Sequence, residues 1–170
     1  MSNKKINHFS LNIRDAKKLG ILVIDIEGAV VFCIDKNTGD ILEKDFLREH
    51  TPKNFHTARA SFKGLSEKKD FNYIEGELNA HLKRSADLAF NFYQKNKFDI
   101  FILGGRKEIL GKIRPDFHNY LQQIIFTEFL ADPDEGTGDV IKKALNAYKE
   151  EINKREKQGL EEALSHHHKK

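Results

Sequence analysis

The chain has 170 residues, of which 39% are hydrophobic and 32% charged, with a net charge of +3. This length fits one domain with a sizeable core, and the single cysteine, Cys33, excludes an intrachain disulfide and a cysteine-based zinc site. No stretch approaches the roughly 20 apolar residues that span a bilayer, and the polar N-terminus has no apolar signal core. We therefore expect a cytoplasmic protein without a membrane partner.

Composition along the chain predicts three parts. Residues 1–17 form a polar lead-in, and residues 18–155 form one α/β domain. Residues 156–170 are charged, and we interpret them as a tail or as a linker to a possible further domain.

The first half of the domain is predicted to be a three-stranded antiparallel meander. Residues 21–35 are rich in Ile and Val and are broken once, at Glu27 and Gly28, which is typical of a hairpin. A second turn is expected at 36–40, where Asn and Gly tolerate positive φ, and a third strand over 41–47. Cys33 lies in the apolar run and is interpreted as a small buried hydrophobe.

The second half alternates predicted helices and strands. A helix running to about residue 96 follows from apolar residues spaced by three and four, with Asp70 as its N-cap; its inward face consists of Phe71, Ile74, Leu78, Leu82, Ala86, Ala89 and Tyr93. The run 98–103 is typical of a buried parallel strand. A helix is expected over 106–113, a strand over 124–130 and a long helix from 139, whose inward residues are Val140, Ala144, Leu145, Tyr148 and Ile152.

A short helical turn is predicted to open at Pro115. We expect its residues Phe117, Tyr120 and Leu121 to point inward. The complete order is then three strands, a long loop, and helices alternating with two further strands. It predicts an α/β fold with a mixed five-stranded sheet, an antiparallel three-strand meander and flanking helices, which is the ribonuclease-H-like topology.

The long loop is the most distinctive segment. Residues 48–70, REHTPKNFHTARASFKGLSEKKD, carry six cations against three carboxylates, a local net charge of +3, with little apolar periodicity. Long loops inside a compact domain are often functional. Cations can contact RNA phosphates, and aromatic rings among them can stack on bases. The predicted RNA-binding residues are Arg48, Lys53, Phe55, His56, Arg59, Phe62, Lys63, Lys68 and Lys69, with His50 nearby. The alternative is an ordinary solvated loop.

Four segments, in this order and spacing, resemble a known family: LGILVIDIEGAVV, FLREHTPKNFHTARASFKG, FNYIEGELNAHLKRSADLAF and FDIFILGGRKEI. The chain resembles the central (second) domain of archaeo-eukaryotic class-1 peptide-chain release factors, of pelota, and of their bacterial relatives, over roughly residues 18–155. The resemblance implies that the ribosome is the partner, with contacts to rRNA and the tRNA acceptor end near the A site. It also implies a translational GTPase as a possible further partner. No DNA and no cofactor are expected.

The family's catalytic tripeptide, Gly-Gly-Gln, has no counterpart in this chain. The matching stretch, residues 50–63, contains no glutamine and no paired glycine. The resemblance therefore implies a termination, rescue or hibernation type of factor that binds without hydrolysing peptidyl-tRNA. A peptidyl-tRNA hydrolase that uses a substitute such as His56 as general base is the alternative.

Two carboxylates near the first turn suggest a further alternative, a metal-dependent nuclease of the ribonuclease-H-like type. Asp25 and Glu27 are two residues apart, so on one strand they would share a face, and Glu75 or Glu77 could add a second ligand. The strand over 98–103, however, ends in Gly104, Gly105 and Arg106, which places a cation where a third carboxylate is needed. The interpretation we favour is that Asp25 and Glu27 belong to the hairpin and its turn.

Two minor motifs complete the candidates. The turn at Gly104 and Gly105 is either a sharp turn or a weak phosphate-binding motif. The tract His166, His167 and His168 could bind a metal. The interpretation we favour is that these three side chains are exposed to solvent in a charged tail.

Overall fold

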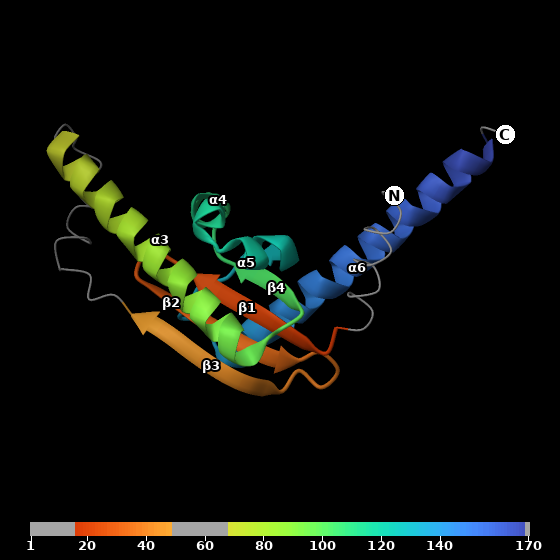
Figure 1. Cartoon of the computed structure of the whole chain (residues 1–170), viewed down its shortest axis with the longest axis horizontal. Coiled ribbons are helices and arrows are strands. Elements are labelled where there is room, and N and C mark those ends of the chain that lie inside the picture. Colours follow the sequence, from red (N-terminus) through yellow and green to blue (C-terminus); the bar gives the residue numbers. More distant parts are fainter. Residues whose placement is uncertain (1–15, 49–67, 169–170) are drawn as a thin grey trace.

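The computed structural model describes residues 16–48 and 68–168, and the burial of side chains for 16–48 and 75–165. These residues form one sheet with helices on both faces (Figure 1). The strands are β1 (Lys18–Ile24), β2 (Gly28–Asp35), β3 (Ile41–Arg48), β4 (Ile100–Gly104) and β5 (Ile125–Phe129). The helices are α3 (Lys68–Asn96), α4 (Lys107–Ile113), the 3-10 helix η1 (Arg114–Asp116), α5 (Asn119–Ile124) and α6 (Thr137–His168).

The strand order is β3-β2-β1-β4-β5. β1, β2 and β3 pair antiparallel, whereas β4 runs parallel to both β1 and β5. α3 connects β3 to β4, and α4, η1 and α5 connect β4 to β5. The predicted fold class is confirmed: an α/β fold with a mixed five-stranded sheet, an antiparallel meander and a ribonuclease-H-like topology.

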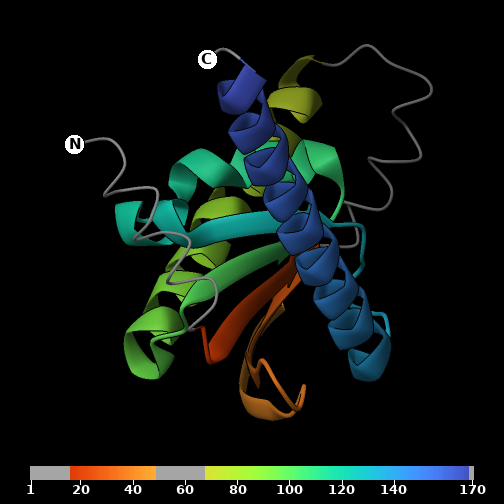
Figure 2. The same ribbon diagram turned by 90° about the vertical axis from the view of Figure 1, so that its right-hand side faces the viewer.

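Apolar side chains on both faces of the central strands build two core layers. In β1, Leu22 and Ile24 face α3, α4 and α5, whereas Leu19, Ile21 and Val23 face α6. This alternation follows from the two-residue period of a strand, and burial on both faces explains why the run is continuously apolar. Figure 2 shows α6 crossing one face of the sheet.

Cys33 lies in the layer that faces α3 and is buried, as the sequence predicts. Burial raises the pKa of its thiol above the ordinary value. A buried thiol with a raised pKa is a poor nucleophile, so Cys33 acts as a small core residue.

Gly20 is the one position of β1 on the α3 face that lacks a side chain. The ring of Phe98, just before β4, fills this space, and a Cβ built on Gly20 would lie 2.5 Å from the ring. Phe98 is fully buried and its ring stacks on Phe101 at 5.4 Å between centroids. The close approach therefore fixes how the end of α3 and the start of β4 meet β1.

The segment around Pro115 differs from the prediction at one residue. Phe117 and Leu121 are buried as expected, but Tyr120 is 61% exposed. The turn is not one continuous helix: η1 ends at Asp116, Phe117 has extended backbone, and His118 caps the separate helix α5. This break resets the helical phase and turns Tyr120 outward.

Helix α6 packs on the sheet only along its first half. The predicted residues Val140, Ala144 and Tyr148 are buried, and the guanidinium of Arg155 lies 4.4 Å from the centroid of the Phe126 ring in β5. Beyond Arg155 the helix continues to His168 and its side chains over 156–165 are exposed. Figure 1 shows this half of α6 extending away from the sheet, so helical structure crosses position 156, where the sequence suggested a tail or linker.

Two glycine substitutions test the packing at Gly20. We expect Gly20→Ala to lower the free energy of unfolding by about 1–3 kcal/mol, because the new methyl group overpacks the Phe98 ring. Gly111→Ala in α4 is the matched control: nothing lies within 4 Å of its Cβ position, so the better helix propensity of Ala should stabilise by about 0.5–1 kcal/mol. Urea denaturation measures both, and equal effects of the two variants would contradict the close packing.

Candidate nucleic-acid interface

The basic segment predicted to bind RNA joins the end of β3 to the start of α3. Arg48 is the last residue of β3 and is exposed, and Lys68 and Lys69 are the first two residues of α3. The other predicted contacts lie outside the described residues, as does His50: Lys53, Phe55, His56, Arg59, Phe62 and Lys63. The structure thus describes both ends of the segment, which lie on the same side of the molecule in Figure 1.

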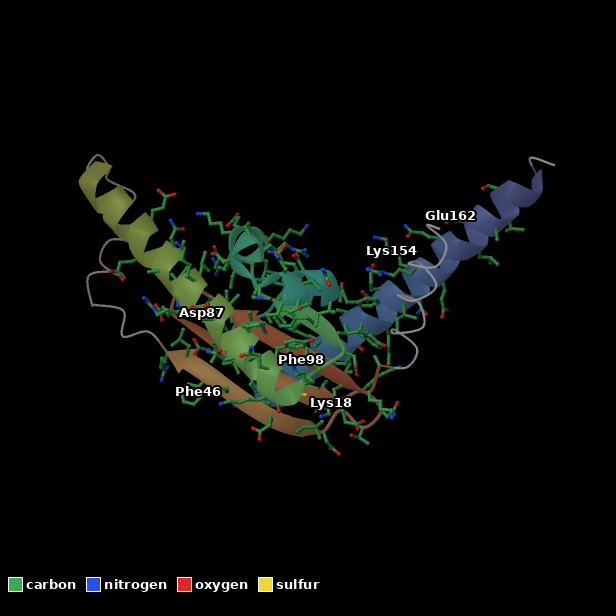
Figure 3. All side chains as sticks on the ribbon, in the orientation of Figure 1. Lys18, Phe46, Asp87, Phe98, Lys154 and Glu162 are labelled. Atoms are coloured by element: carbon green, nitrogen blue, oxygen red, sulfur yellow. The ribbon has the colours of Figure 1, made fainter. Side chains whose placement is uncertain are left out.

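Strand β3, which leads into this segment, is an edge strand. Seven of its eight residues are exposed, including Phe46 at 65%, whose side chain points away from the body of the protein (Figure 3). The charged run Glu43, Lys44 and Asp45 lies in the middle of this edge. Charged side chains on an edge strand disfavour pairing with another strand. We therefore expect that β3 does not extend the sheet and that its end leads into the basic segment.

Helix α3, which follows the segment, is anchored by its middle and extends past the sheet at its N-terminal end (Figure 1). Within the part of α3 whose burial is described, residues 75–77 are exposed, and the first buried side chains are those of His81 and Leu82. A protruding helix start gives the basic segment a support at the periphery of the protein.

A buried histidine fixes this helix to the first hairpin. His81 is 2% exposed, and its Nε2 donates a hydrogen bond to the backbone carbonyl of Asp25 at 2.8 Å. One turn later, Ser85 Oγ donates to the His81 carbonyl at 2.8 Å and is fully buried. The sequence analysis did not predict the pair His81 and Ser85. The signal for it is that these two polar residues are four apart and lie between apolar residues of the inward face of the helix. Buried polar groups need such partners.

The two carboxylates considered as metal ligands do not lie on one strand. β1 ends at Ile24, so Asp25 and Glu27 belong to the β1–β2 turn. The Asp25 Oδ1 accepts hydrogen bonds from the backbone N–H groups of Glu27 at 2.8 Å and of Gly28 at 2.7 Å. The prediction that both side chains share a strand face is therefore wrong, because the turn breaks the two-residue alternation. The interpretation that both carboxylates belong to the hairpin and its turn is confirmed.

A metal cluster is not assembled in the part of the chain that the structure describes. No group of three or more His, Cys, Asp or Glu side chains could hold an ion there. Asp25 is engaged with its own turn, and the end of β4 next to it presents Arg106. The geometry of the described residues therefore gives no support to the nuclease alternative.

Gly104 and Gly105 make a sharp turn at the end of β4. Gly105 has φ +154, and a Cβ there would lie 2.7 Å from the Ile24 carbonyl oxygen. Its N–H donates to the Phe129 carbonyl at 3.0 Å. The Gly105 N–H is therefore used within the sheet, which agrees with the interpretation of this segment as a sharp turn rather than as a phosphate-binding motif.

No family model matches this chain, and a search of curated proteins finds no match. Solved structures do match. The structure of an archaeal translation termination factor, aRF1, has a TM-score of 0.52 at 15% identity, covering 94% of this chain and 45% of that one. A structure described as an archaeal protein has a TM-score of 0.50 at 14% identity, covering 94% of this chain and 44% of that one. Pelota from Archaeoglobus fulgidus has a TM-score of 0.40 at 12% identity, covering 93% and 41%.

This likeness shows the fold. At such identity it says that nearly the whole chain takes the arrangement seen in part of the termination factor. The chain spans less than half the length of these solved structures. Within the described residues, no helix is long and apolar enough to cross a membrane.

Substitutions of Asp25 test whether this carboxylate serves the turn. We expect Asp25→Asn to fold with nearly native stability, because its amide oxygen can still accept the N–H groups of Glu27 and Gly28. Asp25→Ala should lose about 1–2 kcal/mol of unfolding free energy, because two backbone donors lose their partner. Thermal melts with and without Mg²⁺ complete the test: a Mg²⁺-dependent rise in the native Tm that both variants abolish would instead indicate a metal site.

Proposed function

We propose that this protein is a ribosome-associated factor of the termination, rescue or hibernation type, which binds rRNA or the tRNA acceptor end near the A site through the basic segment 48–70. The observation that carries the proposal is the likeness of 94% of the chain to an archaeal translation termination factor, together with the strongly basic composition of the one long segment inserted between β3 and α3.

The physical basis of binding is electrostatic. Six cations against three carboxylates within residues 48–70 give a polyanion a local target, while the whole chain carries only +3. Lys and Arg side chains that neutralise phosphates release counterions, so the affinity falls with salt. Such contacts fix position without reading the base sequence.

Binding without hydrolysis follows from the composition of the same segment. Residues 50–63 contain neither glutamine nor paired glycines, so the side chain that would orient the attacking water is missing. Hydrolysis of a model peptidyl-tRNA ester tests this directly: we expect no rate above the uncatalysed background. A rate that His56→Ala removes would favour the alternative in which this histidine acts as a general base.

The proposal extends to location and partners. A factor that acts on ribosomes works in the cytoplasm, and the exposed half of α6, over 156–165, offers a surface for a translational GTPase or another factor. Co-purification of ribosomal subunits and of a GTPase with the tagged chain would support both points.

A charge-reversal pair tests the basic segment. We expect the native chain to sediment with ribosomes at about 50 mM salt and to be released near 200 mM, as phosphate-driven binding requires. The double variant Arg59→Glu, Lys63→Glu should bind at least ten-fold more weakly, because two phosphate contacts become repulsive, and its salt slope should be smaller by about 1.4.

The matched control reverses two cations elsewhere. Lys149 and Lys154 are exposed on α6 and lie outside residues 156–165, and Lys154 lies on the opposite side of the molecule from the start of α3 (Figure 3). Lys149→Glu, Lys154→Glu changes the net charge equally and should keep native binding. Equal losses in the two double variants would indicate a general charge effect, and retention by Arg59→Glu, Lys63→Glu would refute the proposed interface.

A further inference from the structure

A column of aromatic rings runs along the surface between α3 and α5. Tyr93 lies 6.4 Å from Phe90, Phe90 lies 4.0 Å from His118, and His118 lies 5.1 Å from Tyr120, between ring centroids. The interplanar angles are 25°, 11° and 26°. The four rings are therefore nearly parallel, in the offset stacking that aromatic pairs favour.

The inner end of the column is closed and rooted in the core. Tyr93 and the buried Phe98 pack edge-to-face at 5.1 Å between ring centroids, and the Lys97 Nζ lies 5.1 Å from the Tyr93 centroid, as a cation over a ring. The middle is fixed as well, because the His118 side chain accepts from the Tyr120 N–H as the cap of α5. The orientation of the column is thus set before any ligand arrives.

The outer end is open. Tyr120 is 61% exposed, and its ring contact within the described residues is with His118 alone. The nearby residues in α5 are polar (Asn119, Gln122 and Gln123), and no other large apolar side chain of α4, η1 or α5 is exposed. One flat exposed ring at the end of a stack, with polar groups beside it, presents a face on which a nucleobase can stack.

The segment that carries the open ring is basic. Residues 106–124 contain Arg106, Lys107, Lys112 and Arg114 against Glu108 and Asp116, a local net charge of +2. Arg114 pairs with Glu128 at 2.6 Å. Arg106, Lys107 and Lys112 are exposed and belong to no ion pair among the described residues. The segment that carries the open ring therefore also supplies cations of the kind that bind a phosphate backbone.

We propose that this column is a stacking platform for single-stranded RNA, on which a base of the strand extends the stack at Tyr120 while adjacent phosphates contact the cations of α4. The platform is a second contact in addition to the basic segment, and the choice of RNA as its ligand rests on the proposed function. Stacking on an aromatic face tolerates any base, so the platform gives affinity without sequence preference.

The chain contains no tryptophan, which makes a direct reporter possible. Tyr120→Trp places one indole at the end of the column, and Leu164→Trp, at a 53% exposed position of α6, is the matched control. We expect oligo(A) of about twelve nucleotides to quench the emission of Tyr120→Trp and to leave that of Leu164→Trp unchanged. An abasic oligonucleotide of equal length, which keeps the phosphates, should quench neither.

Affinity for the same oligonucleotides gives the second readout. Tyr120→Ala should bind oligo(A) about ten-fold more weakly, which is the usual loss of one base–aromatic stack, while Tyr120→Phe keeps the ring and should bind within about two-fold of the native chain. Both variants should bind the abasic strand equally.

The outcomes separate the platform from the proposed function. If oligo(A) and the abasic strand bind the native chain equally and Tyr120→Ala is unaffected, the platform is refuted while ribosome binding through the basic segment stands. Equal quenching at positions 120 and 164 would refute it in the same way. If the native chain binds neither oligonucleotide nor ribosomes at any salt concentration, both inferences fail together.

Discussion

The ring of Phe98 occupies the space above Gly20, where a Cβ would lie 2.5 Å from it. This close contact lies where the two halves of the sheet meet, because β1 pairs antiparallel with β2 on one side and parallel with β4 on the other. Phe98 lies two residues before the start of β4. Lys97 has φ +49 and its N–H donates to the Tyr93 carbonyl at 2.7 Å, which ends α3 in a left-handed cap. The cap at Lys97 and the ring of Phe98 together fix where α3 ends. Because a helix is a rigid element, they also help to set the direction of its N-terminal half.

The same ring links the core to the surface. Tyr93 and Phe98 pack edge-to-face, and Phe90, His118 and Tyr120 continue outward from Tyr93. In its middle, α3 is fixed by the hydrogen bond from His81 to the Asp25 carbonyl. The C-terminal half of the helix, from His81 to Asn96, therefore packs on the sheet, while the start of the helix, where the basic segment ends, lies at the periphery of the protein.

Periodicity predicted the elements because burial dictates it. The continuous apolar runs of β1 and β4 follow from two covered faces, and the three-and-four spacing of Leu82, Ala86 and Ala89 follows from one covered stripe. Periodicity failed where an element ends. β1 stops at Ile24, which places Asp25 in a turn, and α5 begins anew at His118, which rotates Tyr120 outward. Neither break has a sequence signal as strong as Gly or Pro at the position itself.

The sequence predicted one candidate RNA contact, the basic segment, and did not predict the other, the aromatic column. Six cations in one apolar-poor segment are visible in any sequence, whereas the column of rings draws members from α3 and α5, 25 or more residues apart, and exists only after folding. The two features also differ in physics. Phosphate contacts weaken with salt and are indifferent to the base, while stacking requires the base to be present and unpaired. A protein that combined them would bind unpaired RNA more tightly than duplex RNA at the same salt concentration, because only unpaired bases can extend the stack. This preference suits a factor that must hold a strand end rather than a duplex.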